Sequence, residues 1–282
     1  MRGRSRSWTL CLVAACARPG VGEVSAVAQA MLQAEDAFER RGAEGSLEPA
    51  IQYYLSALGA DPRSIEARAG LSRAFALKAW SDGVDGLDGY RVAREQGLQC
   101  LLQEPVFRAR VQGGGGRLTA EALEQVDAEH WECMHWAGWA WLRWVHGRSA
   151  SAMALDHEVL LALAERGLEL APDSERAAAL SLYGLALSLD DDRRREADEA
   201  FSEAIANSPR DLVLRLDRVE HILLDDGRLD EAQVALERIA SHHSRGDDPR
   251  QLENKEAAVR AAQLLGVLEQ QDEGADRLER AD

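Results

Sequence analysis

The sequence contains few aromatic residues, few prolines and few β-branched residues. Its 282 residues include 4 Phe, 4 Tyr and 7 Pro, and aromatic side chains make up only 5% of the chain. This scarcity leaves little material for β-strands, whereas the abundant Ala, Leu, Glu and Arg favour helices. We therefore expect an all-α protein. Since 46% of the residues are hydrophobic, the chain can bury one large core or two small ones.

Basic residues are also scarce relative to acidic ones. The chain has 33 Lys and Arg against 49 Asp and Glu, which gives a formal net charge of −16. A negative surface repels nucleic-acid phosphates and anionic lipid headgroups. Long apolar runs are missing as well, since no stretch reaches the roughly 18 apolar residues of a membrane-spanning helix. These absences argue against a nucleic-acid partner and leave a lipid anchor as the only membrane contact that we expect.

Residues 1–15 have the plan of a secretory signal peptide. A start with three arginines and no acid precedes the short apolar run TLCLVAA, and small residues follow. The stretch VAAC, which ends at Cys16, resembles the lipobox of bacterial lipoproteins, in which the cysteine is lipidated and becomes the first residue. We expect Cys16 to carry this lipid. Ordinary signal cleavage after Ala17 and a chance match in a cytoplasmic protein are the alternatives.

A lipid on Cys16 predicts a periplasm-facing protein. Ala17 stands where some bacteria place the Asp that retains a lipoprotein in the inner membrane, so the outer membrane is favoured. Residues 16–23 are rich in Gly and contain one Pro, and we expect them to form a short tether.

Only two cysteines remain for the folded part of the chain. Cys11 leaves with the signal peptide and Cys16 carries the lipid, which leaves Cys100 and Cys133. They could pair in an oxidising periplasm, but two cysteines are not a disulfide framework. We therefore favour two buried free thiols.

From residue 24 onward, apolar residues recur at helical spacing. The pattern predicts a single domain over residues 24–270, built of about eleven helices joined by short turns. A polar tail follows at residues 271–282. Ser64 is a helix-start signal, because its hydroxyl can accept a hydrogen bond from an amide of the first turn. The four glycines at 113–116 mark a flexible connection.

An internal repeat runs through this helical pattern. Its units place small residues on either side of a large one at i, i+4 and i+7, which share one face of a helix. Three units also end in a proline. The units are Ala50-Tyr54-Ala57-Pro62, Ala197-Phe201-Ala204-Pro209, Leu160-Ala164-Gly167-Pro172 and Ala232-Leu236-Ile239. They resemble the second helix of tetratricopeptide (TPR) repeats, and this resemblance implies a superhelical array of stacked helical hairpins.

Residue patterns of catalysis or metal binding are absent from the sequence. His130, Cys133 and His135 are close in sequence, but His135 lies about 140° from His130 around a helix, so the three side chains cannot converge. The four glycines lack the Lys-Ser/Thr of a phosphate-binding loop. No nucleophile, base and oxyanion-hole pattern is present either. We therefore expect a protein that is not an enzyme and that holds no cofactor and no metal.

The aromatic residues are concentrated in one stretch. Residues 130–147, HWECMHWAGWAWLRWVHG, contain five of the seven tryptophans. On a helical projection the apolar arc is far wider than that of a surface helix, which predicts a helix that is largely surrounded. Trp136 and Trp139 fall within or beside a polar sector that holds His135 and Arg143. This sector is typical of a packing helix whose polar groups reach solvent, of a ligand or pore wall, or of a protein interface.

The mature chain resembles, over nearly its whole length, the T-component (TatT) family of TRAP transporters. Its most specific part is a C-terminal motif. The motif comprises Pro249, Leu252, Asn254, Ala258, Arg260, Ala261, Leu264 and Leu265. Trp131, Ala137 and Trp141 match a second family motif, in which His130 replaces a tyrosine. The glycines at 113–116 depart from the family pattern.

The resemblance implies a periplasmic all-α lipoprotein with a cleft or pore and a soluble partner, the substrate-binding protein of a TRAP system. Some members of the family form homotrimers. The family does not fix the transported solute, for which a small hydrophobic molecule or an organic acid is expected. A periplasmic TPR-type scaffold for envelope proteins or peptides is the alternative function.

We expect functional roles for two groups of residues. The candidate ligand-cleft residues are Trp131, His135, Trp136, Trp139 and Arg143. The family-motif residues with an expected structural role are Trp141, Leu252, Asn254 and Arg260. Asn254 and Arg260 are expected to form hydrogen bonds to neighbouring loops.

Overall fold

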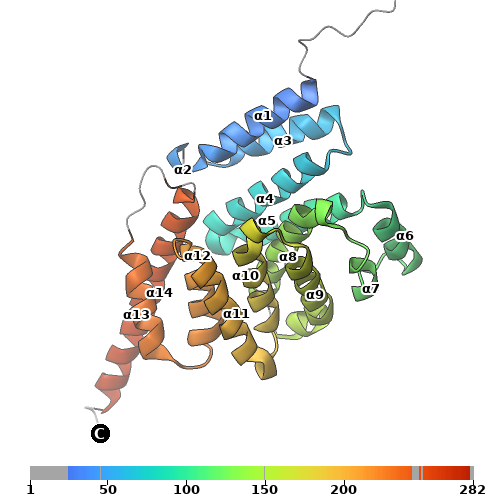
Figure 1. Ribbon diagram of the computed structural model, residues 1–282. Helices are drawn as coiled ribbons and strands as arrows, with labels where there is room; N and C mark the ends of the chain where they lie inside the picture. Colours follow the sequence, from blue (N-terminus) through green and yellow to red (C-terminus); the bar gives the residue numbers. More distant parts are fainter. Residues whose placement is uncertain (1–24, 45, 149, 243–247, 249, 280–282) are drawn as a thin grey trace, which may run out of the picture.

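The computed structural model describes residues 25–44, 46–148, 150–242, 248 and 250–279 (Figure 1). The expected signal peptide 1–15, the tether 16–23, Cys16 and Pro249 lie outside these residues. The described part of the chain contains no β-strand, so the expected all-α class is confirmed. The helices are α1 (Ala26–Glu39), α2 (Arg41–Glu44), α3 (Glu48–Ala60), α4 (Ile65–Ser81), α5 (Leu87–Leu101), α6 (Pro105–Gly113), α7 (Ala120–Leu123), α8 (Trp131–His146), α9 (Ala150–Leu170), α10 (Arg176–Leu187), α11 (Arg194–Asn207), α12 (Leu212–Arg218), α13 (Leu229–Ala240) and α14 (Gln251–Glu279).

Neighbouring helices pack as hairpins in a TPR-like superhelical array. The main pairs are α1 with α3, α4 with α5, α10 with α11, and α13 with α14. Helix α8 lies at the centre, in contact with α4, α5, α9 and α10 (Figure 1). Two of the helices, α2 and α7, are only four residues long. The described residues form fourteen α-helices, against the expected number of about eleven, and these two short helices account for most of the difference.

Two of the repeat residues form contacts between neighbouring helices. Tyr54 of α3 and Phe201 of α11 are fully buried, and each packs on a glycine of the adjacent helix. A Cβ atom at Gly70 of α4 would lie 2.3 Å from the Tyr54 ring, and one at Gly184 of α10 would lie 3.1 Å from the Phe201 ring. The large residue of each unit therefore fills a groove that a glycine opens in its neighbour.

Replacing Gly70 by alanine is expected to lower the free energy of unfolding by about 1–3 kcal/mol, because the new methyl group overpacks the interface. The Tyr54 ring cannot move away easily, since its hydroxyl donates to Glu35 at 2.6 Å and accepts from Arg73 at 2.9 Å. Gly59→Ala is the matched control, because nothing lies within 4 Å of a Cβ at that position. Urea unfolding of both variants measures the difference between their free energies of unfolding. Equal stability of the two would contradict the proposed groove.

The local start and turn signals act largely as expected. The Ser64 hydroxyl accepts a hydrogen bond from the Ala67 amide at 3.2 Å and caps α4. The glycine run follows α6 as a turn, in which Gly115 and Gly116 have φ angles of 72° and 82°. Glycine is favoured there because other residues rarely adopt positive φ. At the C-terminus α14 continues to Glu279, so the helix extends beyond residue 270, where we expected the domain to end.

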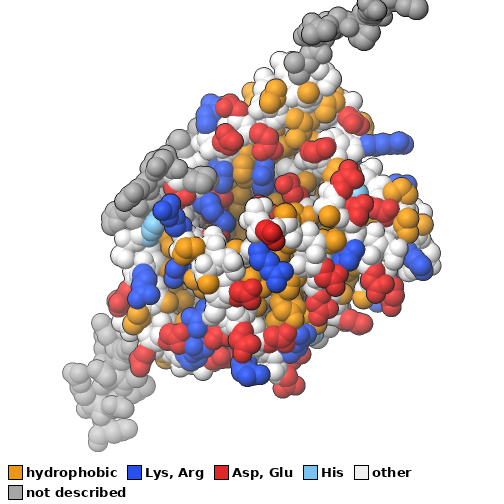
Figure 2. All heavy atoms as spheres, viewed as in Figure 1, with side chains coloured by type: hydrophobic (Ala, Val, Ile, Leu, Met, Phe, Trp, Pro, Cys, Tyr) orange, Lys and Arg blue, Asp and Glu red, His pale blue; other side chains and the backbone are white. Residues whose placement is uncertain are grey.

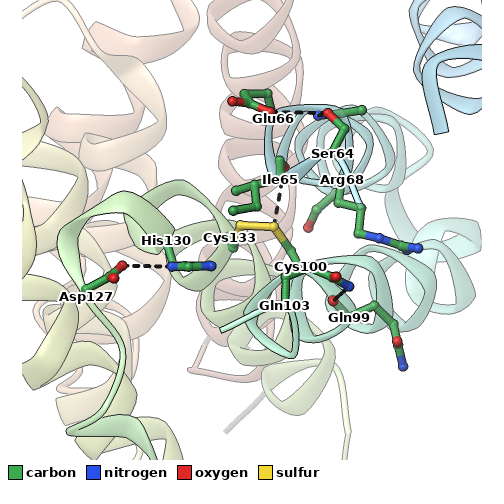
Figure 3. The surroundings of a disulfide bond; sticks show 12 residues. Ser64, Ile65, Glu66, Arg68, Gln99, Cys100, Gln103, Asp127, His130 and Cys133 are labelled. Atoms are coloured by element: carbon green, nitrogen blue, oxygen red, sulfur yellow. Dashed lines mark hydrogen bonds and ion pairs between the residues drawn. A yellow bond between two sulfur atoms is a disulfide. The ribbon is translucent and has the colours of Figure 1, made fainter. Parts of the chain in front are cut away.

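A disulfide joins Cys100 of α5 to Cys133 of α8, and the expectation of two free thiols is therefore wrong (Figure 3). The Cα atoms lie 5.7 Å apart, a usual separation for a bridge. The two helices approach closely because Gly97 faces Ala137, where a Cβ on the glycine would lie 2.7 Å from the alanine Cβ. Cys100 lies about one turn after Gly97, and Cys133 lies about one turn before Ala137. This contact therefore brings the two cysteines together.

The last helix returns to the beginning of the domain. Helix α14 contacts α2 and α4 as well as α12 and α13 (Figure 1). A buried ion pair joins Arg41 to Glu253 at 2.6 Å, with side-chain exposures of 8% and 4%.

Basic side chains are interspersed among acidic ones on the face of the protein shown in Figure 2. No helix in the described residues is long and apolar enough to cross a membrane.

Candidate functional site

Helix α8 is largely surrounded by other helices, as the width of its apolar arc predicts. Trp131, Trp139 and Trp141 are buried, whereas Trp136 and Trp144 are half-buried. Trp139 contacts three other rings edge-on, those of Trp80, Tyr90 and Trp136, at centroid distances of 6.2, 6.0 and 5.9 Å. These rings form one aromatic cluster between α4, α5 and α8, the arrangement that aromatic quadrupoles favour.

A first cavity lies beside α8 and is lined by three of the five predicted cleft residues, His135, Trp136 and Trp139. Its volume is about 40 Å³, which makes it narrow. The remaining lining residues come from α4, α10, α12 and the start of α14. They include Trp80, Ser181, Asp211, Arg250 and Glu253.

Several buried polar atoms of this lining have no hydrogen-bond partner among the described residues. They are Trp80 Nε1, His135 Nδ1, Ser181 Oγ and Glu253 Oε2. Buried polar atoms are normally paired with protein, water or a ligand. Indole faces beside unpartnered donors and acceptors occur in small-molecule sites, but a volume of about 40 Å³ has room for only part of such a molecule.

Arg143 and His135 are buried, so the alternative of a packing helix whose polar groups reach solvent does not hold for these two residues. Arg143 is buried and ion-paired with Asp217 of α12. Its guanidinium stacks on Trp80 and Trp139, 4.4 and 4.6 Å from the ring centroids. Stacking and pairing together make the burial of this charge tolerable. Angular position on a helix could not reveal that a carboxylate from 74 residues away lies opposite.

Arg143 lines a second, larger cavity of about 280 Å³. This cavity is lined by Gly83, Leu87, Tyr90, Arg143, His146, Gly147, Glu220, His221 and Arg260. Trp80 and Trp139 line the first cavity, and Arg143, which stacks on both rings, lines the second. These three side chains therefore connect the walls of the two cavities. Trp131 lines neither cavity and packs on His135 with a centroid distance of 5.1 Å.

The family-motif residues hold the fold around these cavities. Trp141 Nε1 donates to Asp156 at 2.8 Å, and Leu252 is buried. Asn254 accepts a hydrogen bond from the Leu212 amide at 3.0 Å and donates to the Arg210 carbonyl at 3.3 Å. The hydrogen bonds expected of Asn254 are thus present, and they fix the loop before α12.

Arg260 contacts a helix side chain rather than a loop. It pairs with Glu220 and stacks on Trp80 at 5.3 Å. Glu220 belongs to a π-helical turn, Val219–Leu223, that continues α12. Arg260 therefore bridges α14 to this turn at the edge of the second cavity.

One set of described residues could hold a metal ion, and the sequence analysis missed it. Asp217, Glu220 and His221 place their potential ligand atoms within 4.8 Å of one another. Their spacing of i, i+3 and i+4 is the available signal, since it puts all three on one helix face. The set considered in the sequence is not brought together, because Cys133 is bonded to Cys100 and His130 pairs with Asp127 at 2.7 Å (Figure 3).

Burial sets the protonation of the main titratable groups. It lowers the pKa of His135 to about 4, with a smaller contribution from the positive charge of Arg250. Burial also lowers the pKa of His146 to about 4. It raises the pKa of Asp217 to about 6 against the opposing effect of Arg143. The imidazoles of His135 and His146 are therefore neutral at pH 7.

The stability of the protein is expected to fall in acid partly through His135. Its pKa in the folded state, about 4, lies below the unfolded value of about 6.5. The unfolded chain thus binds the proton more tightly, and the contribution of neutral His135 is complete above pH 6.5 and is lost toward pH 4. Between these values the slope approaches about 1.4 kcal/mol per pH unit.

Urea unfolding of the wild type and His135→Gln at several pH values from 7 to 4 checks this expectation. The wild type should lose stability more steeply than the variant, because the other buried histidines act equally in both. Parallel pH profiles would show that His135 does not titrate in this way.

Comparisons with known proteins give distant structural similarity only. No protein-family model matches the chain, and no curated protein matches it. A solved structure of PilF from Pseudomonas aeruginosa is similar over 84% of this chain and 93% of that chain, with 16% sequence identity and a TM-score of 0.41. This likeness is low, and it does not show the T-component family.

Proposed function

We propose that this protein is a non-enzymatic accessory component of a TRAP-type solute transporter. In this function it docks the periplasmic substrate-binding protein and holds part of the solute in the cavity beside α8. One observation carries the proposal: His135, Trp136 and Trp139, chosen from the sequence as cleft residues, converge on one cavity. The unpartnered buried atoms of Trp80, Ser181 and His135 in the same lining support a polar, ligand-binding use of that space.

Docking is tested by native mass spectrometry of the mature chain mixed with the substrate-binding protein of the same cell's transporter. The proposal expects a complex at protein concentrations of about 20–50 µM, as for a transient interface of micromolar affinity. The same spectra report whether the chain itself is a homotrimer. No complex at these concentrations would sink the docking function.

The lipid anchor is a separate part of the proposal. It rests on the VAAC stretch and on the absence of a membrane-spanning helix from the described residues. We expect Cys16→Ser to move the protein from the membrane fraction, with the outer membrane as its source, into the soluble periplasmic fraction. Unchanged membrane partitioning would refute lipidation at Cys16.

A periplasmic scaffold for peptides or envelope proteins is the second candidate, and the TPR-like hairpin array favours it. A scaffold binds its partners along the surface of the array. Peptide binding that is insensitive to Trp136→Leu and Trp139→Leu supports this function. Loss of binding of the solute in the same variants supports the transporter function.

A further inference from the structure

Three potential metal ligands lie on one helical segment, and two of them, Glu220 and His221, line the second cavity. Asp217 lies at the end of α12, and Glu220 and His221 lie in the π-helical turn that follows. Their ligand atoms are all within 4.8 Å of one another. The Asp217 and Glu220 side chains are only 0% and 9% exposed, so the three groups form an interior cluster rather than a solvated acidic face.

Each carboxylate divides its two oxygens between an arginine and this cluster. Arg143 binds Asp217 Oδ1, and Arg260 binds Glu220 Oε1. The other oxygens, Asp217 Oδ2 and Glu220 Oε2, have no hydrogen-bond partner among the described residues, and neither has His221 Nε2. Three residues whose potential ligand atoms lie within 4.8 Å of one another therefore each carry a buried atom without a partner, which is costly unless something binds there.

The donor set and the neighbouring charges restrict what can fill the region. One imidazole nitrogen with two carboxylate oxygens suits zinc-class transition metals, whereas Mg²⁺ and Ca²⁺ prefer oxygen ligands alone. The guanidinium groups of Arg143 and Arg260 cancel the two carboxylate charges and repel a cation. An ion that binds weakly to nitrogen cannot overcome this repulsion, which selects further against Mg²⁺ and Ca²⁺.

We propose that Asp217, Glu220 and His221 form a site for one divalent transition-metal ion of the zinc class. The arginines fix the orientation of the two carboxylates, as hydrogen-bonded neighbours of metal ligands usually do. Three protein ligands leave at least one position for water, and Glu220 and His221 place it at the 280 Å³ cavity. The site does not depend on the transporter function proposed above.

The test uses the full mature chain, freed of metal with a chelator and titrated with Zn²⁺ by calorimetry. Co²⁺ titration adds an absorption readout that reports ligand type. The site predicts one Zn²⁺ per chain, a Co²⁺ spectrum without a thiolate charge-transfer band, and no comparable binding of Mg²⁺. A single ligand substitution, His221→Gln, should weaken Zn²⁺ binding by at least about tenfold.

Two further variants make the result decisive. His157→Gln on α9 is the matched control, since it also removes a buried unpartnered imidazole nitrogen but lies outside the cluster, and it should bind Zn²⁺ like the wild type. Glu220→Gln replaces His221→Gln if the latter does not fold, as judged by circular dichroism. The inference is overturned if the wild type binds no Zn²⁺, or if His221→Gln and Glu220→Gln both bind it as the wild type does.

Discussion

Replacing Arg143 by methionine is expected to lower the free energy of unfolding by about 3–5 kcal/mol, because Asp217 is then left as an unpaired charge in the core. Both side chains are almost completely buried, with exposures of 5% and 0%. The substitution also removes the guanidinium from between Trp80 and Trp139. Urea unfolding in the presence of a chelator measures the change without interference from bound metal.

A double variant separates the ion pair from packing. Arg143→Met with Asp217→Leu removes both charges and keeps apolar volume, so it should recover most of the stability lost by Arg143→Met alone, since apolar replacements of a buried pair are often neutral or better. A loss below about 1 kcal/mol in the single variant would show that the pair is hydrated, as at a protein surface.

Removing the disulfide is expected to cost about 2–4 kcal/mol, because the bridge closes a loop in the unfolded chain. The two cysteines are 33 positions apart, and a loop of this length gives a stabilisation in the upper half of that range in the chain-entropy model. The variant Cys100→Ala with Cys133→Ala should unfold at lower urea concentration than the oxidised wild type.

Reduction provides the control for this prediction. A reductant should lower the unfolding midpoint of the wild type toward that of the double-alanine variant and leave the variant unchanged. If the oxidised and reduced wild type unfold at the same midpoint, the bridge does not constrain the native fold. Both cysteines are completely buried, so the reductant must be present throughout the unfolding and refolding equilibrium.

Local sequence patterns were sufficient to predict the helical class and the burial of the tryptophan helix. Apolar spacing located α8, and the width of its apolar arc indicated that other helices surround it. The repeat residues Tyr54 and Phe201 are identified by spacing alone, and both are fully buried between neighbouring helices. These features depend on residues that are close in the chain, for which periodicity is informative.

Contacts between distant segments could not be predicted in the same way. The spacing around α8 leaves open whether Arg143 faces solvent, a cleft or a partner, because its partner Asp217 comes from another helix, 74 residues away. Cys100 and Cys133 meet because Gly97 allows α5 to approach α8, which no spacing of cysteines indicates. The cluster of Asp217, Glu220 and His221 shares one helix face, but its unpartnered atoms are evident only once Arg143 and Arg260 occupy the other carboxylate oxygens.

The features of α8 combine to position the candidate site. The disulfide fixes its first turn to α5, and the Arg143–Asp217 pair fixes its last part to α12. Between these attachments, His135, Trp136 and Trp139 line the first cavity. A helix held at both ends keeps these side chains in place, which is the preorganisation that a binding site requires.

Equilibrium dialysis of solute extracted from the native substrate-binding protein measures whether the first cavity binds that solute. Ala178 lines this cavity, whereas Ala235 of α13 lines a different pocket. We expect equal binding by the wild type and Ala235→Leu, and at least about tenfold weaker binding by Ala178→Leu, whose larger side chain fills the cavity. Equal binding by all three proteins, or binding by none, would contradict this expectation.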